Sequence, residues 1–236
     1  AYHFKAGQVR ARVPLIKMIT SAITIGSGGS AGKEGPIAQI GSGFASFLGS
    51  LLKTDTRDRR IMLLAGAAGG ISAIFKAPLG ASLFATEVLY REPEFEFEAI
   101  IPSVVSSIVA YTVFTLVQGW DTLFHVPRLV PVIASTDLLI YGIFGVLAAG
   151  VGFFYIHIFY GMRDRFFKRL NFPRFLKPAL GGLMLGVVAF FLPQVLGGGY
   201  EWIQSAIDGN LTIGLMVSLV FAKIFATSFT ISSGGS

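Results

Sequence analysis

One stretch of the sequence has the residue types and spacing of an ion-binding turn. Residues 26–36 read Gly-Ser-Gly-Gly-Ser-Ala-Gly-Lys-Glu-Gly-Pro. The glycines predict an irregular turn, and because proline is typical of the first helical position, we expect Pro36 to begin a helix. A helix N-terminus offers outward-pointing amide groups and about half a positive charge, which together bind anions. Partial charges attract an ion and still release it, as conduction requires.

Glu34 is the titratable residue of this turn. At membrane depth a carboxylate costs about 2.5–3.5 kcal/mol on insertion scales and marks an ion or proton pathway. At a positive helix end it can stay ionised, and there it would occupy the place of an anion. We therefore expect a plug that protonation or an entering anion displaces. The structural alternative is a capping carboxylate paired with Lys33. A nucleotide P-loop is excluded, because glutamate follows the lysine where serine or threonine is required.

The composition indicates which kind of protein must position this turn. The 236 residues are 53% hydrophobic and only 14% charged, with 22 phenylalanines and no cysteine. Soluble domains are about 25% charged. The charge deficit excludes disorder, a coiled coil and a nucleic-acid arm, so we expect no nucleic-acid partner. The net charge of +6 is typical of basic membrane loops. The sequence predicts an all-α, multi-pass membrane protein in a lipid bilayer.

The apolar segments fall into two length classes. A full crossing needs about 20 apolar residues. Three or four segments qualify among Glu98–Gly119, Leu138–Tyr160, Pro178–Leu196 and Leu211–Ile231. Shorter segments, rich in glycine and alanine or marginal in length, are Val13–Gly26, Gly35–Leu52, Ile61–Phe75 and Pro78–Tyr90. Short pieces interrupted by Gly or Pro are typical of re-entrant half-helices. We place the breaks near Gly26–Pro36 and Lys76–Pro78.

Most basic residues lie in three segments, residues 5–17, 53–60 and 163–177. The positive-inside rule predicts that all three are cytoplasmic. Lys223 lies in the middle of the last predicted crossing, and we expect it near a water-filled vestibule rather than snorkelling to the interface. Neither end of the sequence is typical of a natural terminus, which predicts a piece of a longer chain.

The run from Gly32 to Pro36, followed by Gln39-Ile40-Gly41, resembles the signature of the CLC chloride channels and transporters. The resemblance continues through residues 63–70, 75–79 and 83–87, and to Ser232-Ser233-Gly234-Gly235. It implies an inverted-repeat CLC-type architecture with broken half-helices. It also implies that residues 1–236 are part of one transmembrane domain truncated at both ends, and that the protein forms a homodimer. The family pore motifs expected before residue 1 and after residue 236 are missing.

The same resemblance assigns roles to single residues. It makes Glu34 the gating glutamate and places the backbone of Lys33, Glu34 and Gly35 along the anion sites, with Gly32 and Pro36 supporting the motif. The inner proton position of many family exchangers falls on Val88, which cannot titrate, and the neighbouring Glu87 is a possible substitute. The resemblance therefore favours a gated channel for chloride or a similar small anion. The alternative is a proton-coupled chloride or fluoride antiporter.

Two more distant alternatives are an unrelated secondary transporter and a non-transporting membrane scaffold. Neither predicts this particular motif with a carboxylate at a helix break. The sequence has no paired acids or nucleophile–base sets, so we expect no enzyme. The three histidines are far apart in the sequence, which favours packed side chains over metal ligands, and we expect no metal or cofactor.

Overall fold

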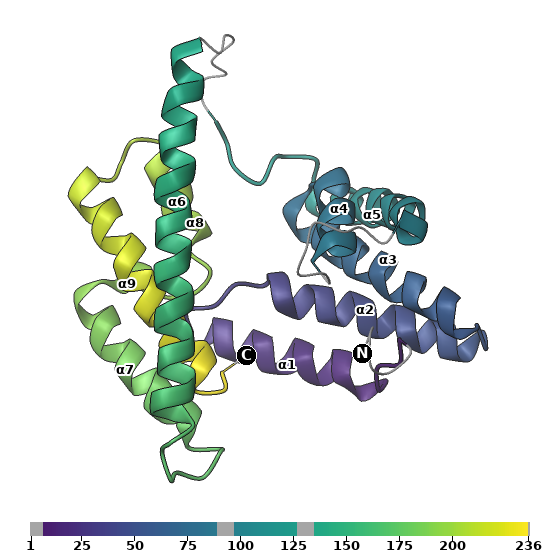
Figure 1. Ribbon diagram of the computed structural model, residues 1–236, viewed down its shortest axis with the longest axis horizontal. Coiled ribbons are helices and arrows are strands. Elements are labelled where there is room, and N and C mark those ends of the chain that lie inside the picture. The colour runs from purple at the N-terminus through teal and green to yellow at the C-terminus, as the bar shows by residue number, and fades with distance from the viewer. Residues whose placement is uncertain (1–6, 89–96, 127–134, 236) are drawn as a thin grey trace. The chain divides into compact units, whose positions relative to one another are not determined.

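The computed structural model describes residues 7–88, 97–126 and 135–235. In this part of the chain all regular elements are helices, as predicted. Residues 5 and 6 of the first basic segment, and the predicted helix end at Tyr90, lie outside the described residues. The chain divides into two compact units, one of residues 1–22 and 32–123 and the other of residues 23–31 and 124–236 (Figure 1).

The first unit is built around one central helix. Its elements are α1 (Arg12–Gly26, whose last turn belongs to the second unit), α2 (Glu34–Leu51), α3 (Thr56–Phe75), α4 (Pro78–Glu87) and α5 (Phe97–Gln118). α3 packs against α2, α4 and α5. Its buried Leu63 and Leu64 contact Ala99 of α5, and alanines of α3 contact Ala85 of α4. Small side chains thus dominate the helix contacts.

Glycines allow the closest of these contacts. A Cβ on Gly41 of α2 would overlap the carbonyl oxygen of Gly66 on α3, and a Cβ on Gly66 would overlap that of Gly41. Without side chains at these two positions the backbones approach directly, which is how apolar helices associate in lipid, where the hydrophobic effect cannot drive them together.

α3 begins earlier than predicted. The apolar segment Ile61–Phe75 is preceded by a further helical turn from Thr56, so part of the basic segment 53–60 is helix. Asp55 caps this helix, because its carboxylate accepts a hydrogen bond of 2.7 Å from the Asp58 amide. The cap satisfies an amide that has no acceptor within the helix.

The predicted break at Lys76–Pro78 is confirmed. Lys76 has a left-handed backbone (φ 52°) and ends α3, and Pro78 is the first residue of α4. The Lys76 ammonium donates to the carbonyls of Gly119 (2.9 Å) and Asp121, just beyond the end of α5. With 10 residues, α4 is about 15 Å long. It is therefore a half-helix, too short to cross a bilayer.

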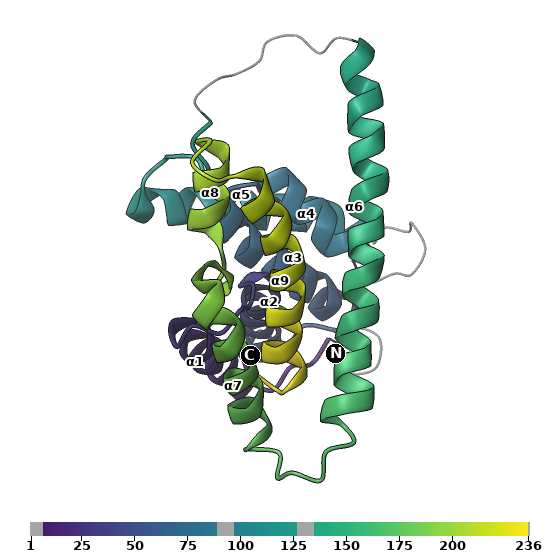
Figure 2. The same ribbon diagram turned by 90° about the vertical axis from the view of Figure 1, so that its left-hand side faces the viewer.

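The second unit contains three apolar helices. Its elements are α6 (Ser135–Gly161), the π-helix η1 (Met162–Phe167), α7 (Lys177–Phe191), the 3₁₀ turn η2 (Pro193–Val195), α8 (Tyr200–Ile207) and α9 (Ile213–Ser232). α9 packs against both α6 and α7 (Figures 1 and 2). Leu185 of α7, Val195 of η2 and Ala226 of α9 form the buried core.

Three described stretches are long and apolar enough to cross a membrane: Phe97–Gln118, Asp137–Phe167 and Ile213–Ser232. They match three of the four candidate crossings. The fourth, Pro178–Leu196, is wrong in length, because α7 ends at Phe191 after 15 residues. Pro193 has no amide hydrogen and disfavours helix in the residue before it, so the helix ends there.

Candidate functional site

The turn after α1 leads into the N-terminus of α2. α1 ends at Gly26 and α2 begins at Glu34, which confirms a break within residues 26–36. The helix begins two residues before Pro36, where we expected its start. Ile37 donates the first hydrogen bond of the helix, to the Lys33 carbonyl at 3.0 Å. The reason is that proline, lacking an amide hydrogen, is tolerated anywhere in the first turn. The amides of Lys33, Glu34 and Gly35 therefore precede the hydrogen-bond ladder of the helix.

The Glu34 side chain folds back over the N-terminal end of its own helix. Helical side chains lean toward the N-terminus, and Glu34 is the first helical residue. A Cβ on Gly32 would overlap the Glu34 carboxylate, so this carboxylate lies directly against the Gly32 backbone. Glu34 is exposed. An exposed negative charge thus lies at the positive end of α2, where an anion would be stabilised.

The earlier part of the glycine-rich turn is anchored within the second unit. The Gly29 amide donates to the Thr24 carbonyl (2.8 Å) and the Gly197 amide to the Gly28 carbonyl (3.4 Å). Gly28 has a φ of +93°, which favours glycine. Ser30 is fully buried. Its amide donates to the Thr230 hydroxyl at 3.1 Å.

α9 presents a polar stripe to this turn, formed by Lys223, Thr227 and Thr230. Spacings of four and three residues place the three side chains on one helix face. The Thr227 and Ser30 hydroxyls lie 3.1 Å apart in hydrogen-bond contact. The Lys223 ammonium donates to the carbonyls of Val195 (2.8 Å) and Gly197 (2.7 Å). The Lys223 side chain therefore anchors the backbone at Val195 and Gly197. The sequence analysis did not predict this role.

A cavity of about 320 Å³ lies beside the same turn in the second unit. Residues Ser27, Gly28 and Gly29 line it on one side, and Thr230 and Ser233 on another. Its polar lining comes from hydroxyl and backbone groups. Such neutral dipoles can solvate an ion without binding it irreversibly.

The predicted inner proton position lies at the end of α4. Glu87 is the last helical residue and Val88 follows it as the C-cap. Both side chains are exposed, Val88 at 55%. The side chains of adjacent helical residues point about 100° apart, so those of Glu87 and Val88 point in different directions.

Metal ligands are not brought together in the described part of the chain, where no three His, Asp or Glu residues form a group. The backbone of His125 instead bonds the Gln204 side chain twice, at 2.9 Å in each direction. His157 stacks on Phe153 within α6. His3 lies outside the described residues.

Sequence comparison relates the whole chain to known proteins. The family model described as "Voltage gated chloride channel" matches residues 1–236. The chain is 33% identical over 220 residues to an uncharacterized protein of Methanocaldococcus jannaschii, covering 93% of this chain and 54% of that protein. It is 30% identical over 229 residues to the H(+)/Cl(−) exchange transporter ClcA of Cronobacter sakazakii, covering 94% of this chain and 48% of that transporter. The chain thus spans about half the length of these relatives.

Solved structures share the fold. A CLC-type fluoride/proton antiporter superposes with a TM-score of 0.85 at 24% identity, over 97% of this chain and 57% of that one. A slow cyanobacterial Cl⁻/H⁺ antiporter superposes with a TM-score of 0.82 at 21% identity, over 95% of this chain and 52% of that one. The apolar helices and the CLC fold make the chain an integral, multi-pass membrane protein. Because the family model matches every residue from 1 to 236, this chain belongs to the voltage-gated chloride channel family, the CLC family.

Proposed function

We propose that the protein containing this chain exchanges a small anion, such as chloride, for protons across a membrane, with Glu34 as the gating carboxylate. The observation that carries the proposal is the position of the Glu34 carboxylate, which lies against Gly32 at the N-terminal end of α2. One place can then hold either the carboxylate or an anion, and protonation decides which of the two is favoured there.

The relatives support exchange better than the channel that the sequence analysis favoured. The ClcA proteins of Cronobacter sakazakii and Citrobacter koseri, 30% and 32% identical to this chain, are H(+)/Cl(−) exchange transporters. Both fold neighbours are proton-coupled antiporters, one for fluoride and one for chloride. The anion of this protein is proposed as chloride or fluoride by the same analogy.

In the proposed mechanism the amides of Lys33, Glu34 and Gly35 stabilise an anion at the end of α2. The ionised Glu34 carboxylate competes for the same positive end. An arriving proton neutralises the carboxylate, which loses its attraction to the helix end and leaves it to the anion. Gly32 and Pro36 support this arrangement: Gly32 makes room for the carboxylate, and Pro36 lacks an amide hydrogen that would need an acceptor.

A gated chloride channel is the second candidate, and Val88 is the observation that favours it. A valine cannot carry a proton, so coupling would need another group, such as Glu87, or a water chain. The Chloride channel protein CLC-f of Arabidopsis thaliana is 31% identical to this chain, which covers 30% of its length. Channel and exchanger share the gating role of Glu34 and differ only in whether protons move.

We further propose that the three basic segments, 5–17, 53–60 and 163–177, face the cytoplasm. This follows from the positive-inside rule. By analogy with the family, the chain would form part of one transmembrane domain in a homodimer, and the missing pore elements would complete the anion pathway.

The test is simultaneous recording of chloride and pH with the full-length protein in sealed vesicles. An imposed chloride gradient should drive protons uphill in the wild type. Glu34→Gln should abolish proton movement and leave chloride flux intact or raised, because the neutral side chain no longer competes with anions. Glu34→Ala should do the same, and both should weaken the pH dependence of chloride flux.

The possible outcomes separate the two candidates. Passive chloride flux without uphill proton movement, with gating lost in Glu34→Gln, would establish a channel and overturn exchange. Proton pumping that persists in both Glu34 variants would overturn the gating role and leave Glu34 as a helix cap. Loss of proton movement in Glu87→Gln would assign the inner proton position to Glu87.

A further inference from the structure

The segment that links α6 to α7, residues 162–177, combines positive charge with exposed aromatic side chains. It contains the third of the three basic segments, residues 163–177, and from here on we call residues 162–177 the basic segment. It has a single acid, Asp164, and six basic residues: Arg163, Arg165, Lys168, Arg169, Arg174 and Lys177. Such clusters directly after an apolar helix are typical of sites for anionic headgroups.

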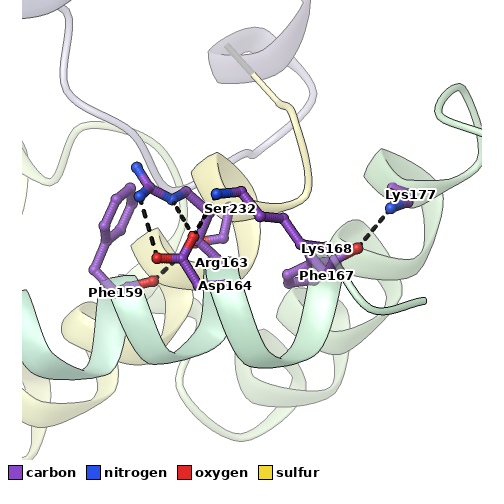
Figure 3. Close-up of polar contacts among 7 residues, drawn as sticks. All are labelled: Phe159, Arg163, Asp164, Phe167, Lys168, Lys177 and Ser232. Atoms are coloured by element: carbon purple, nitrogen blue, oxygen red, sulfur yellow. Dashed lines mark hydrogen bonds and ion pairs between the residues drawn. The ribbon is translucent and has the colours of Figure 1, made fainter.

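Three of the six basic residues, Arg163, Lys168 and Lys177, make the internal contacts drawn in Figure 3. Asp164 binds Arg163 and Lys168, each at 2.8 Å. Lys177 donates to the Phe167 carbonyl at 2.6 Å. Arg165, Arg169 and Arg174 are exposed, and no carboxylate among the described residues forms a salt bridge with any of these three. Three guanidinium groups are therefore available to an external anion.

The beginning of the basic segment is firmly placed. η1 forms wider π-helical turns, closed by a 3.0 Å hydrogen bond from the Lys168 amide to the Arg163 carbonyl. Phe167 is buried within this turn, at 2% exposure. Its neighbours Arg165 and Arg169 remain on the outside. Arg165 is thus presented from a helical turn, and Arg169 follows two residues after the end of that turn.

Apolar side chains alternate with the available arginines. Phe172 and Phe175 are 54% and 78% exposed, and Arg174 lies between them in the sequence. α6 has 27 residues and is about 40 Å long, which spans the hydrocarbon core and part of the headgroup region. We therefore infer that the basic segment, most of which follows the crossing stretch Asp137–Phe167, lies at headgroup depth. There the guanidinium groups meet phosphates and the phenyl rings meet acyl chains.

We propose that the basic segment is a binding site for anionic phospholipids of the adjacent leaflet. Arg165, Arg169 and Arg174 bind the lipid phosphates, for which planar guanidinium groups are well suited. Phe172 and Phe175 insert beside the acyl chains. The alternation of exposed rings with cations next to a crossing helix favours a lipid surface over a soluble anion, which would leave the rings in water.

The experiment measures lipid binding to the full-length protein in neutral detergent by native mass spectrometry, with phosphatidylglycerol as the anionic probe and phosphatidylcholine as the neutral one. Each basic residue near an anionic surface contributes about fivefold in affinity. The triple variant Arg165→Gln, Arg169→Gln and Arg174→Gln should therefore lose on the order of 100-fold for phosphatidylglycerol. Its affinity for phosphatidylcholine should hardly change.

A matched control removes the same charge elsewhere. Arg10, Arg12 and Lys53 are exposed basic residues of the other two basic segments. Their replacement by glutamine should change the affinity of this site less than about fivefold, the effect of one residue. An equal loss in both triple variants would mean that only net charge matters and would overturn the proposal.

Asp164→Asn provides a test in the opposite direction. This substitution releases Arg163 and Lys168 from their shared carboxylate, so phosphatidylglycerol should bind several-fold more tightly. Damage to the fold would instead weaken phosphatidylglycerol binding. Phe175→Ala should weaken phosphatidylglycerol binding and leave binding of soluble glycerol phosphate unchanged. Glycerol phosphate bound as tightly as the lipid would assign the segment to a soluble anion and contradict the membrane site.

Discussion

Replacing Gly32 by alanine should open the proposed gate without removing its charge. The Glu34 carboxylate lies so close to the Gly32 backbone that a Cβ would overlap it. The overlapping atoms belong to the end of a flexible side chain, so the carboxylate can swing away while the backbone stays in place. Gly32→Ala therefore displaces an ionised Glu34, whereas Glu34→Gln neutralises it.

The expected change in anion affinity follows from the interaction with the helix N-terminus that the displaced carboxylate loses. A negative charge at an exposed helix N-terminus contributes about 0.3–1 kcal/mol, and about 2 kcal/mol in favourable, partly buried geometry. Glu34 is exposed, so the lower range applies. Losing this interaction shifts the balance between carboxylate and anion by about 2- to 5-fold. We expect the apparent anion affinity of the full-length protein to rise by that factor at neutral pH.

The assay is chloride binding by isothermal titration calorimetry, followed by chloride efflux from vesicles at several pH values. Gly32→Ala should raise affinity most where Glu34 is ionised, and the difference from wild type should vanish in acid, where the plug is neutral in both. Gly142→Ala is the control, because a Cβ there meets nothing within 4 Å. An unchanged affinity at neutral pH, or an equal gain at all pH values, would refute the displacement argument.

Two further predictions concern the anchor of the turn. Thr230→Val leaves the buried Ser30 amide without its 3.1 Å acceptor and should lower the free energy of unfolding by about 1–3 kcal/mol. Denaturation in detergent measures this change, and an unchanged free energy of unfolding would contradict the anchoring role. Lys223→Met removes hydrogen bonds to the carbonyls of Val195 and Gly197 and should cost at least about 2 kcal/mol. Lys223→Arg should recover part of that loss, whereas equal effects of both variants would exclude a donor role.

Segment length and composition predicted most of the fold, because lipid imposes strong constraints on both. The crossings predicted at Glu98–Gly119, Leu138–Tyr160 and Leu211–Ile231 match α5, α6 and α9 within a few residues. Errors arose where helix ends do not follow hydropathy. α3 continues into the charged residues after Asp55, whose cap is visible in the sequence but carries no apolar signal, and Pro193 ends α7 before the apolar run is complete.

The site was predictable where its determinants are local. Glycine-rich sequence, Pro36 and the position of Glu34 follow one another within residues 26–36, and the structure places a helix N-terminus there. The anchor was not predictable, because Ser30 and Thr230 are 200 residues apart in the sequence. A weaker signal existed in the spacing of Lys223, Thr227 and Thr230. Three polar residues on one face of an apolar helix indicate a polar partner, although they do not identify it.

The proposed proton coupling does not depend on Val88 alone. A titratable relay is needed only where the proton must cross a region without water, and the C-terminal end of α4 presents both Glu87 and Val88 as exposed side chains. If water reaches this end of α4 in the full-length protein, it can deliver the proton in place of a carboxylate. What coupling cannot dispense with is a group that exchanges a proton for an anion at one place. Among the described residues of the turn, Glu34 is the one carboxylate, and it lies at the N-terminal end of α2. Valine at position 88 therefore weighs against a side-chain relay there, and is compatible with the exchange proposed through Glu34.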